Sequence, residues 1–188
     1  MNTTQKIVFP LLSLFLSYRT LELVRVLLAS DPSEFGTIEV LWISFMLTLF
    51  VTGIFAFVGF AYPTSRILPE GYYTIKNPQA LTQICSAMGV KYFRFLLLFT
   101  FWGTEKNRKK YFNGTKKGIA NFVYQTHQSE FGHLAAFIVI GIISILLLAH
   151  GYFFLVLIVT LINIVGNLYP ILLQRQHRIR IEKVKNYL

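Results

Sequence analysis

Four apolar segments, each close to the length that crosses a bilayer, constrain this chain more than any other feature. They run roughly over residues 7–29, 38–62, 132–148 and 152–173. A helix needs about 20 consecutive apolar residues to cross the hydrocarbon core, and lipid offers no partner to unpaired backbone groups. The sequence therefore predicts an all-α integral membrane protein with about four transmembrane helices.

The composition supports this class and argues against others. Of the 188 residues, 54% are hydrophobic and only 14% are charged, which is too apolar for an ordinary soluble domain. The net charge of +10 could suggest nucleic acid, but the basic residues cluster beside apolar segments, as membrane topology requires. The single cysteine, Cys85, excludes an intramolecular disulfide framework and a four-cysteine zinc site. We expect membrane lipids, and no nucleic acid, as partners.

The first apolar segment is expected to stay in the protein, because it lacks a lysine-rich start and a small-residue cleavage site. It continues through Arg19, Glu22 and Arg25. Glu22 lies three residues from each arginine, so the opposite charges can neutralise one another along one stripe. That stripe should face the helix bundle, or the segment should lie partly at the membrane interface.

The distribution of basic residues predicts the orientation of the chain. The connection over residues 63–131 and the C-terminal tail are rich in lysine and arginine, whereas the link around Asp31 has neither, and the turn at His150 and Gly151 is short. Basic connections remain in the cytoplasm. We therefore expect a single membrane domain over residues 1–188, in the cell (inner or plasma) membrane, with both termini cytoplasmic.

A shorter apolar segment, residues 90–102, lies within the long connection. Its length of about 13 residues is too short to span the bilayer comfortably. Turn formers, including Pro69, Gly71 and Pro78, break the region that precedes it. The sequence predicts an interfacial or re-entrant helix and leaves the choice between the two open.

Polar side chains leave the fourth segment along one face. At 100° per residue, Asn163, Asn167, Gln174 and Arg178 lie within an arc of roughly 60°. Amides inside a membrane helix are costly unless they face protein, water or ligand, which favours a functional interior surface. The alternative is structural, because asparagine also hydrogen-bonds one membrane helix to another.

A second polar group, His127, Glu130 and His133, stands at intervals of three residues where the third segment begins. Glu130 could hydrogen-bond either histidine, and a carboxylate beside an imidazole raises its basicity for proton transfer. The Glu-x-x-His spacing also occurs in carboxylate metal sites, but the other segments hold no second copy. We therefore expect no metal. A structural cap at the membrane surface is the remaining alternative.

Antiparallel pairing of the third and fourth segments would bring the two groups together. Equal helical rise on both sides of the turn places Asn167 within a turn of His133. Gln174 and Arg175 would close the same pocket from the cytoplasmic side. Pro170 has no N–H to donate, so the helix should kink beside these residues and make room for a ligand.

These motifs resemble those of the glycosyl-4,4'-diaponeurosporenoate acyltransferases, membrane enzymes of glycosylated C30 carotenoid synthesis. The resemblance rests on Glu-x-x-His at the start of an apolar segment, here Glu130 and His133. It also rests on the pattern N-x6-Q-R-x-x-R-x-R after the next segment, formed by Asn167, Gln174, Arg175, Arg178 and Arg180. The similarity covers roughly the last third of the chain.

The resemblance implies transfer of a fatty acyl group to a sugar hydroxyl of a glycosylated lipid or carotenoid. His133 would act as general base and Glu130 would orient it. The substrate, a lipid-linked glycoside, would be bound by Asn163, Asn167, Gln174, Arg175 and Arg178, with Asn167, Gln174 or Arg175 as donors to the oxyanion.

No cofactor is expected for this reaction, and an acyl carrier could supply the acyl group. The sequence contains no G-x-S-x-G nucleophile elbow, which favours direct transfer over a serine-bound intermediate. The competing hypothesis is a non-enzymatic small membrane protein that binds lipid or a partner subunit. In that case the asparagines and arginines would hold helices and headgroups.

Overall fold

The structure is a computed structural model that describes residues 3–100 and 116–185. These residues form helices and turns without any strand. Four helical stretches are long and apolar enough to cross a membrane: Thr4–Ala29, Thr37–Ala61, Gly118–Ala149 and Phe153–Lys183. The predicted all-α membrane class is therefore confirmed.

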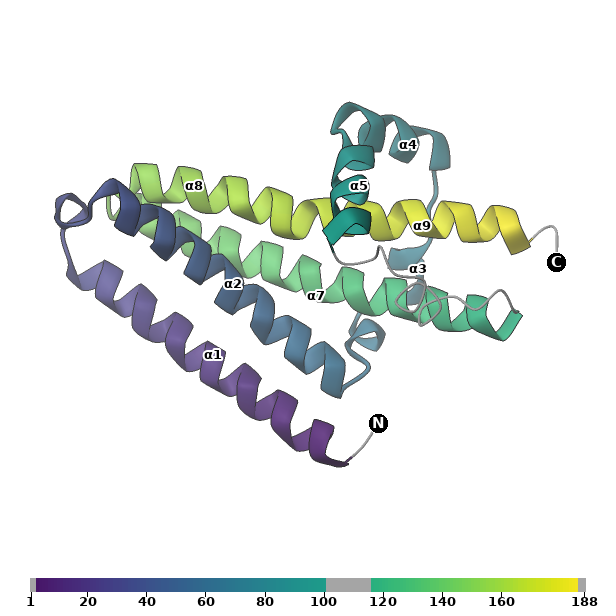
Figure 1. Cartoon of the computed structure of the whole chain (residues 1–188), viewed down its shortest axis with the longest axis horizontal. Helices are drawn as coiled ribbons and strands as arrows, with labels where there is room; N and C mark the ends of the chain where they lie inside the picture. Colours follow the sequence, from purple (N-terminus) through teal and green to yellow (C-terminus); the bar gives the residue numbers. More distant parts are fainter. Residues whose placement is uncertain (1–2, 101–115, 186–188) are drawn as a thin grey trace. The chain divides into compact units, whose positions relative to one another are not determined.

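The elements follow one another along the chain as α1 (Thr3–Ala29), η1 (Pro32–Glu34), α2 (Thr37–Ala61), η2 (Thr64–Ile67), α3 (Glu70–Tyr73), α4 (Pro78–Ala87), α5 (Val90–Thr100), α7 (Lys116–Ala149), α8 (Phe153–Asn163), η3 (Ile164–Leu168) and α9 (Tyr169–Lys185) (Figure 1). They form two compact units. The first unit comprises Met1–Thr64 and Gly132–Leu168, and the second comprises Ser65–Phe131 and Tyr169–Leu188. The helix α7 continues from the second unit into the first, so the division into units does not by itself define separate domains. The single membrane domain stays a prediction.

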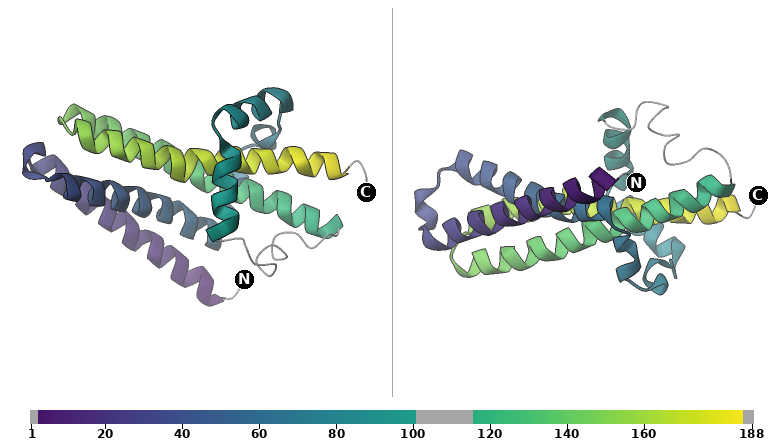
Figure 2. Two further views of the ribbon diagram at one scale, coloured as in Figure 1. Left: turned by 45° about the horizontal axis from the view of Figure 1, so that its top comes forward. Right: turned by 90° about the horizontal axis from the view of Figure 1, so that it is seen from below.

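The first unit consists of two helical hairpins. α1 packs along α2, and α2 packs against α8, as the views in Figure 2 also show. Their contact surfaces form one apolar core, which contains Leu27, Leu47, Val51, Ala136, Ile140, Leu147, Leu155 and Val159. Many large apolar side chains on the outer faces remain exposed. This is the pattern expected of helices whose outer faces contact lipid.

The turns of the two hairpins lie at the same end of the first unit. The Tyr152 hydroxyl donates to the backbone carbonyls of Leu27 at 2.6 Å and Ser30 at 3.0 Å. Its ring also packs against Phe35. Gly151 makes the second turn with a φ of 85°, which glycine adopts without a steric cost. The side of the membrane that these turns occupy stays a prediction.

In the second unit, α4 and α5 form a hairpin that packs against α9 (Figure 1). Gly89 joins the two helices with a φ of 67°. The Tyr169 hydroxyl on α9 donates to the Met88 carbonyl at 2.7 Å, and the Cys85 thiol lies 3.9 Å from the Leu172 carbonyl. Cys85 is buried, and burial raises the pKa of its thiol. These contacts make it a packing residue.

The predicted interfacial segment corresponds to α5, and its last two expected residues lie outside the described part of the chain. A helix of 11 residues is about 16 Å long, roughly half the thickness of the hydrocarbon core. Val90 is buried, whereas Tyr92, Phe95 and Phe99 are exposed. An exposed aromatic face fits either an interfacial or a re-entrant location, so that choice stays a prediction.

Two helices extend beyond the predicted apolar segments. α7 begins at Lys116, well before residue 132, and the fourth candidate span continues to Lys183, beyond residue 173. Hydropathy marks only the apolar part of a helix. Ile119, Thr126 and Glu130 are buried in the second unit, so the polar part of α7 also packs against other residues of that unit.

The charged stripe of α1 does not face the interior of the first unit. Arg19 and Glu22 form an ion pair, but their side chains are 45% and 43% exposed, and Arg25 is exposed as well. Of the two predicted alternatives, a stripe that faces the helix bundle does not fit these exposed side chains. A position partly at the membrane interface therefore stays a prediction.

Candidate functional site

The helix that precedes Pro170 changes its hydrogen-bonding pattern. Residues Ile164–Leu168 (η3) form a π-helical segment between α8 and α9. Pro170 cannot bond the carbonyl of Gly166, which agrees with a local departure from the α-helical pattern. The structure has a π turn at this position, whereas the predicted kink and the room for a ligand stay predictions. Asn163 and Asn167, at its two ends, are buried in the first unit at 4% and 0% exposure.

These two asparagines belong to a directed hydrogen-bond network in the first unit. Asn163 Nδ2 donates to the backbone carbonyl of Phe137 at 3.1 Å. Its Oδ1 then accepts from Asn167 Nδ2 at 2.9 Å. The same Asn167 nitrogen lies 3.1 Å from Thr52 Oγ1. Because the Phe137 carbonyl can only accept, it determines the orientation of both amides.

The network determines which nitrogen of His133 carries the proton. His133 Nδ1 lies 3.0 Å from Asn167 Oδ1, and the predicted proximity of these residues is therefore confirmed. Since Asn167 presents its oxygen, the imidazole must donate through Nδ1–H. In the neutral imidazole, Nε2 thus keeps the lone pair that can accept a proton.

Both amide hydrogens of Asn167 are directed at partners, Asn163 and Thr52. In this arrangement the amide has no further hydrogen for an oxyanion and its oxygen contacts His133, while the predicted role of Asn167 as a donor to the substrate stays a prediction. Thr52 is a site residue that the sequence interpretation missed. The signal that could have found it is the hydroxyl series Ser44, Thr48 and Thr52, spaced four residues apart on α2.

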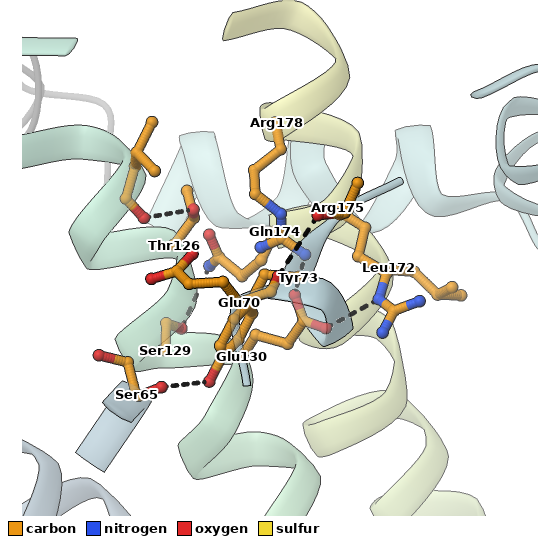
Figure 3. A network of polar contacts seen from close by, with 12 residues as sticks. Ser65, Glu70, Tyr73, Thr126, Ser129, Glu130, Leu172, Gln174, Arg175 and Arg178 are labelled. Carbon is orange, nitrogen blue, oxygen red and sulfur yellow. Dashed lines mark hydrogen bonds and ion pairs between the residues drawn. The ribbon is translucent and has the colours of Figure 1, made fainter. Parts of the chain in front are cut away.

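The second unit holds a carboxylate bound by two arginines (Figure 3). Glu130 on α7 is completely buried. Its Oε1 accepts from Arg175 Nε at 2.8 Å, and its Oε2 accepts from Arg178 Nη2. Next to this group, Gln174 Nε2 donates to Ser129 Oγ at 3.2 Å. Four of the predicted site residues of α7 and α9 thus lie in one cluster.

The hydrogen bonds of Glu130 differ from the expectation that it orients a histidine. Both carboxylate oxygens bind guanidinium groups, and charge-assisted bonds of this kind are roughly twice as strong as neutral ones. His127 instead stacks on Tyr73, with ring centroids 4.1 Å apart and planes 9° from parallel. The residue that orients His133 in the structure is Asn167.

Two tyrosines of α3, also missed as site residues, cover the arginines. The Arg175 guanidinium lies 5.0 Å from the Tyr72 ring centre, and that of Arg178 lies 5.7 Å from the Tyr73 ring centre. The Tyr73 hydroxyl donates to the Ser65 carbonyl at 2.9 Å. Burial, and then the negative charge of Glu130, raise the pKa of Tyr73 to about 12. The tyrosine therefore remains a neutral donor at physiological pH.

The structure places the predicted site residues in two groups. His133, Asn163 and Asn167 lie in the first unit, whereas Glu130, Gln174, Arg175 and Arg178 lie in the second. The predicted pocket that would join the groups, and the catalytic and substrate-binding roles of their members, stay predictions. Within the described residues, no three His, Cys, Asp or Glu side chains gather closely enough to hold a metal ion.

The helices and polar clusters define the class of the protein: a helical membrane protein with an imidazole–amide cluster and a buried carboxylate–guanidinium cluster. Residues 69–186 match the model of the CrtO family, glycosyl-4,4'-diaponeurosporenoate acyltransferase, and the chain belongs to this family. The resemblance is confirmed and extends over the last two thirds of the chain. The family is one of acyltransferases in carotenoid biosynthesis. No curated protein and no solved structure matches the chain.

Proposed function

We propose that the protein transfers a fatty acyl group to a sugar hydroxyl of a glycosylated lipid or carotenoid, with His133 as the general base. Family membership supports acyl transfer. The observation that carries the assignment of the base is the contact of His133 Nδ1 with Asn167 Oδ1. It leaves Nε2 as the proton acceptor, and Asn167 can stabilise the ring when it becomes positively charged.

The proposed reaction is a direct transfer. The sugar oxygen attacks the acyl carbonyl carbon while His133 Nε2 removes the hydroxyl proton. The tetrahedral intermediate then collapses, the bond between the acyl carbon and the donor breaks, and Nε2 returns the proton to the leaving group. A thioester donor, such as an acyl carrier, would leave as a thiol. A general base contributes about 10² to 10⁴ in rate to a step of this kind.

The proposal includes a location in the cell (inner or plasma) membrane with both termini in the cytoplasm. The apolar helices and the basic connections support this arrangement. A lipid-linked glycoside would then reach the protein within the bilayer, and a soluble acyl donor would approach from the cytoplasm. No resident cofactor is proposed, because acyl transfer from an activated donor needs none.

The test is an assay of acylated glycolipid in membranes that contain matched amounts of each variant. His133→Ala should lower the rate by about two to four orders of magnitude. His150→Ala is the matched control, because His150 is exposed at the turn after α7, and it should retain full activity.

Full activity of His133→Ala would remove the proposed mechanism. Absence of any acylated product from the unmodified protein, also in lipid extracts compared with and without the gene, would favour the alternative of a non-enzymatic protein that binds lipid or a partner subunit.

A further inference from the structure

Arg178 in the second unit has hydrogen-bond donors that bind no other residue in the described part of the chain. Its side chain is buried, with the residue only 6% exposed. Nη2 binds Glu130, but Nε and Nη1 have no partner among the residues that the structure describes. Buried polar groups are almost always hydrogen-bonded, and an unsatisfied charged group is especially costly. These donors therefore point to a group that the described residues do not supply.

The charges of the cluster indicate the sign of that group. Arg175 and Arg178 carry two positive charges and Glu130 carries one negative charge, so the three side chains have a net charge of +1. Ser129 and Gln174 beside them are neutral. Glu70 at the start of α3 is exposed, and water therefore solvates its carboxylate. A ligand with a single negative charge would neutralise the buried cluster.

Tyr73 covers Arg178, and its own contacts are weak enough for such a ligand to displace it. Tyr73 lies over the guanidinium and is attached through a neutral hydrogen bond to the Ser65 carbonyl and a stack on His127. A charge-assisted bond between arginine and an anionic oxygen is roughly twice as strong as a neutral one. The helix α3 that carries Tyr73 has only four residues. Its movement would expose Nε and Nη1.

We propose that Arg178 and Arg175 form a binding site for a singly charged phosphodiester, with Glu130 holding both guanidinium groups in place. Arginine suits this role because its planar donors match phosphate oxygens. Phospholipid headgroups contain a phosphodiester, and so does the phosphopantetheine arm of an acyl carrier. Only the second source rests on the proposed acyl transfer.

The test measures binding to the purified full-length protein in a phosphate-free detergent. One probe is dioctanoyl phosphatidylglycerol, with dioctanoylglycerol as its phosphate-free control. The other is an acyl carrier protein loaded with an acyl phosphopantetheine arm, with the form that lacks the arm as control. Binding of phosphatidylglycerol identifies a headgroup site, and binding of the loaded carrier alone identifies a donor site.

Arg178→Gln should weaken binding of the phosphodiester probe by about 10- to 100-fold, the effect of losing hydrogen bonds to a charged group. Arg180→Gln removes an exposed charge two residues further along α9 and should change binding less than twofold. Equal losses in the two variants would indicate general electrostatic attraction and overturn the site.

Two further variants guard against a folding defect in Arg178→Gln. Arg178→Lys keeps a positive charge beside Glu130 but lacks the guanidinium fork, so it should also lose most of the binding. Tyr73→Phe removes the bond to the Ser65 carbonyl that holds the cover and should tighten binding by about two- to tenfold.

Weaker binding by Tyr73→Phe, or no binding of either probe by the unmodified protein, would overturn the proposal. Neither result affects the His133 assay, so the two proposals fail separately.

Discussion

His133 Nδ1 and Asn167 Oδ1 lie 3.0 Å apart, although 34 residues separate them in the chain. The direction of this contact follows from the backbone carbonyl of Phe137, which accepts from Asn163 and thereby orients both amides. The Phe137 carbonyl, which can only accept, thus determines the tautomer of a histidine at the other end of a series of three hydrogen bonds. The imidazole nitrogen available to a substrate is Nε2.

Replacing Thr52 should test whether this network supports activity. Thr52→Val keeps the shape of the side chain but removes the hydrogen bond to Asn167. The loss of one neutral hydrogen bond, about 0.5–1.5 kcal/mol, predicts a two- to tenfold lower rate. Thr48→Val is the matched control one turn away, because among the described residues the Thr48 hydroxyl bonds only the Ser44 carbonyl of its own helix. The measurement is kcat and KM for acyl transfer. Equal rates for both variants would show that Thr52 does not contribute to activity.

Neutralising Glu130 should destabilise the protein strongly. In Glu130→Gln, the guanidinium groups of Arg175 and Arg178 lose their buried counter-charge. Breaking a buried ion pair from one side costs about 3–5 kcal/mol. Glu70→Gln, at an exposed position of the same unit, should stay within about 0.5 kcal/mol of the unmodified protein. Thermal or denaturant unfolding in detergent measures the difference, and matching stabilities of the two variants would contradict the burial of the charge.

The raised pKa of Tyr73 predicts a loss of stability at high pH. The phenol ionises at about 12 in the folded protein, compared with 10.0 as its ordinary value. Between these pH values the unfolded tyrosine releases its proton and the folded one keeps it, so the free energy of unfolding decreases as the pH rises. Tyr73→Phe lacks this proton and should show a shallower decrease from pH 10 to 12. An unchanged slope would exclude Tyr73 as its source.

Cysteine labelling in intact cells tests the orientation. Ser33→Cys and His150→Cys lie in the two turns that share one end of the first unit and should both react with an impermeant maleimide. Lys76→Cys, in the basic connection, should be protected until the membrane is opened. The native thiol, Cys85, is buried and has a raised pKa, which keeps its background reaction low. Labelling of Lys76→Cys in intact cells would indicate the opposite orientation.

The pattern of side chains along the chain was sufficient for the class of fold. Apolar segments of about 20 residues leave a lipid-embedded backbone no alternative to the helix, and a short turn between two such segments requires them to be antiparallel. From these two facts the sequence predicted four spans and the proximity of His133 to Asn167. The motifs around Glu130 and Asn167 also indicated the correct family.

Tertiary structure alone decided which polar atoms pair. Spacing determines the face of a helix on which a side chain lies, but a buried carboxylate such as Glu130 binds the strongest donors within reach, and those are arginines 45 and 48 residues away. For the same reason Asn167, and not Glu130, contacts His133, and Thr52 bonds Asn167. The sequence by itself determined the helices and their approximate depth. Packing decided the hydrogen bonds between side chains, because they depend on contacts between residues far apart in the chain.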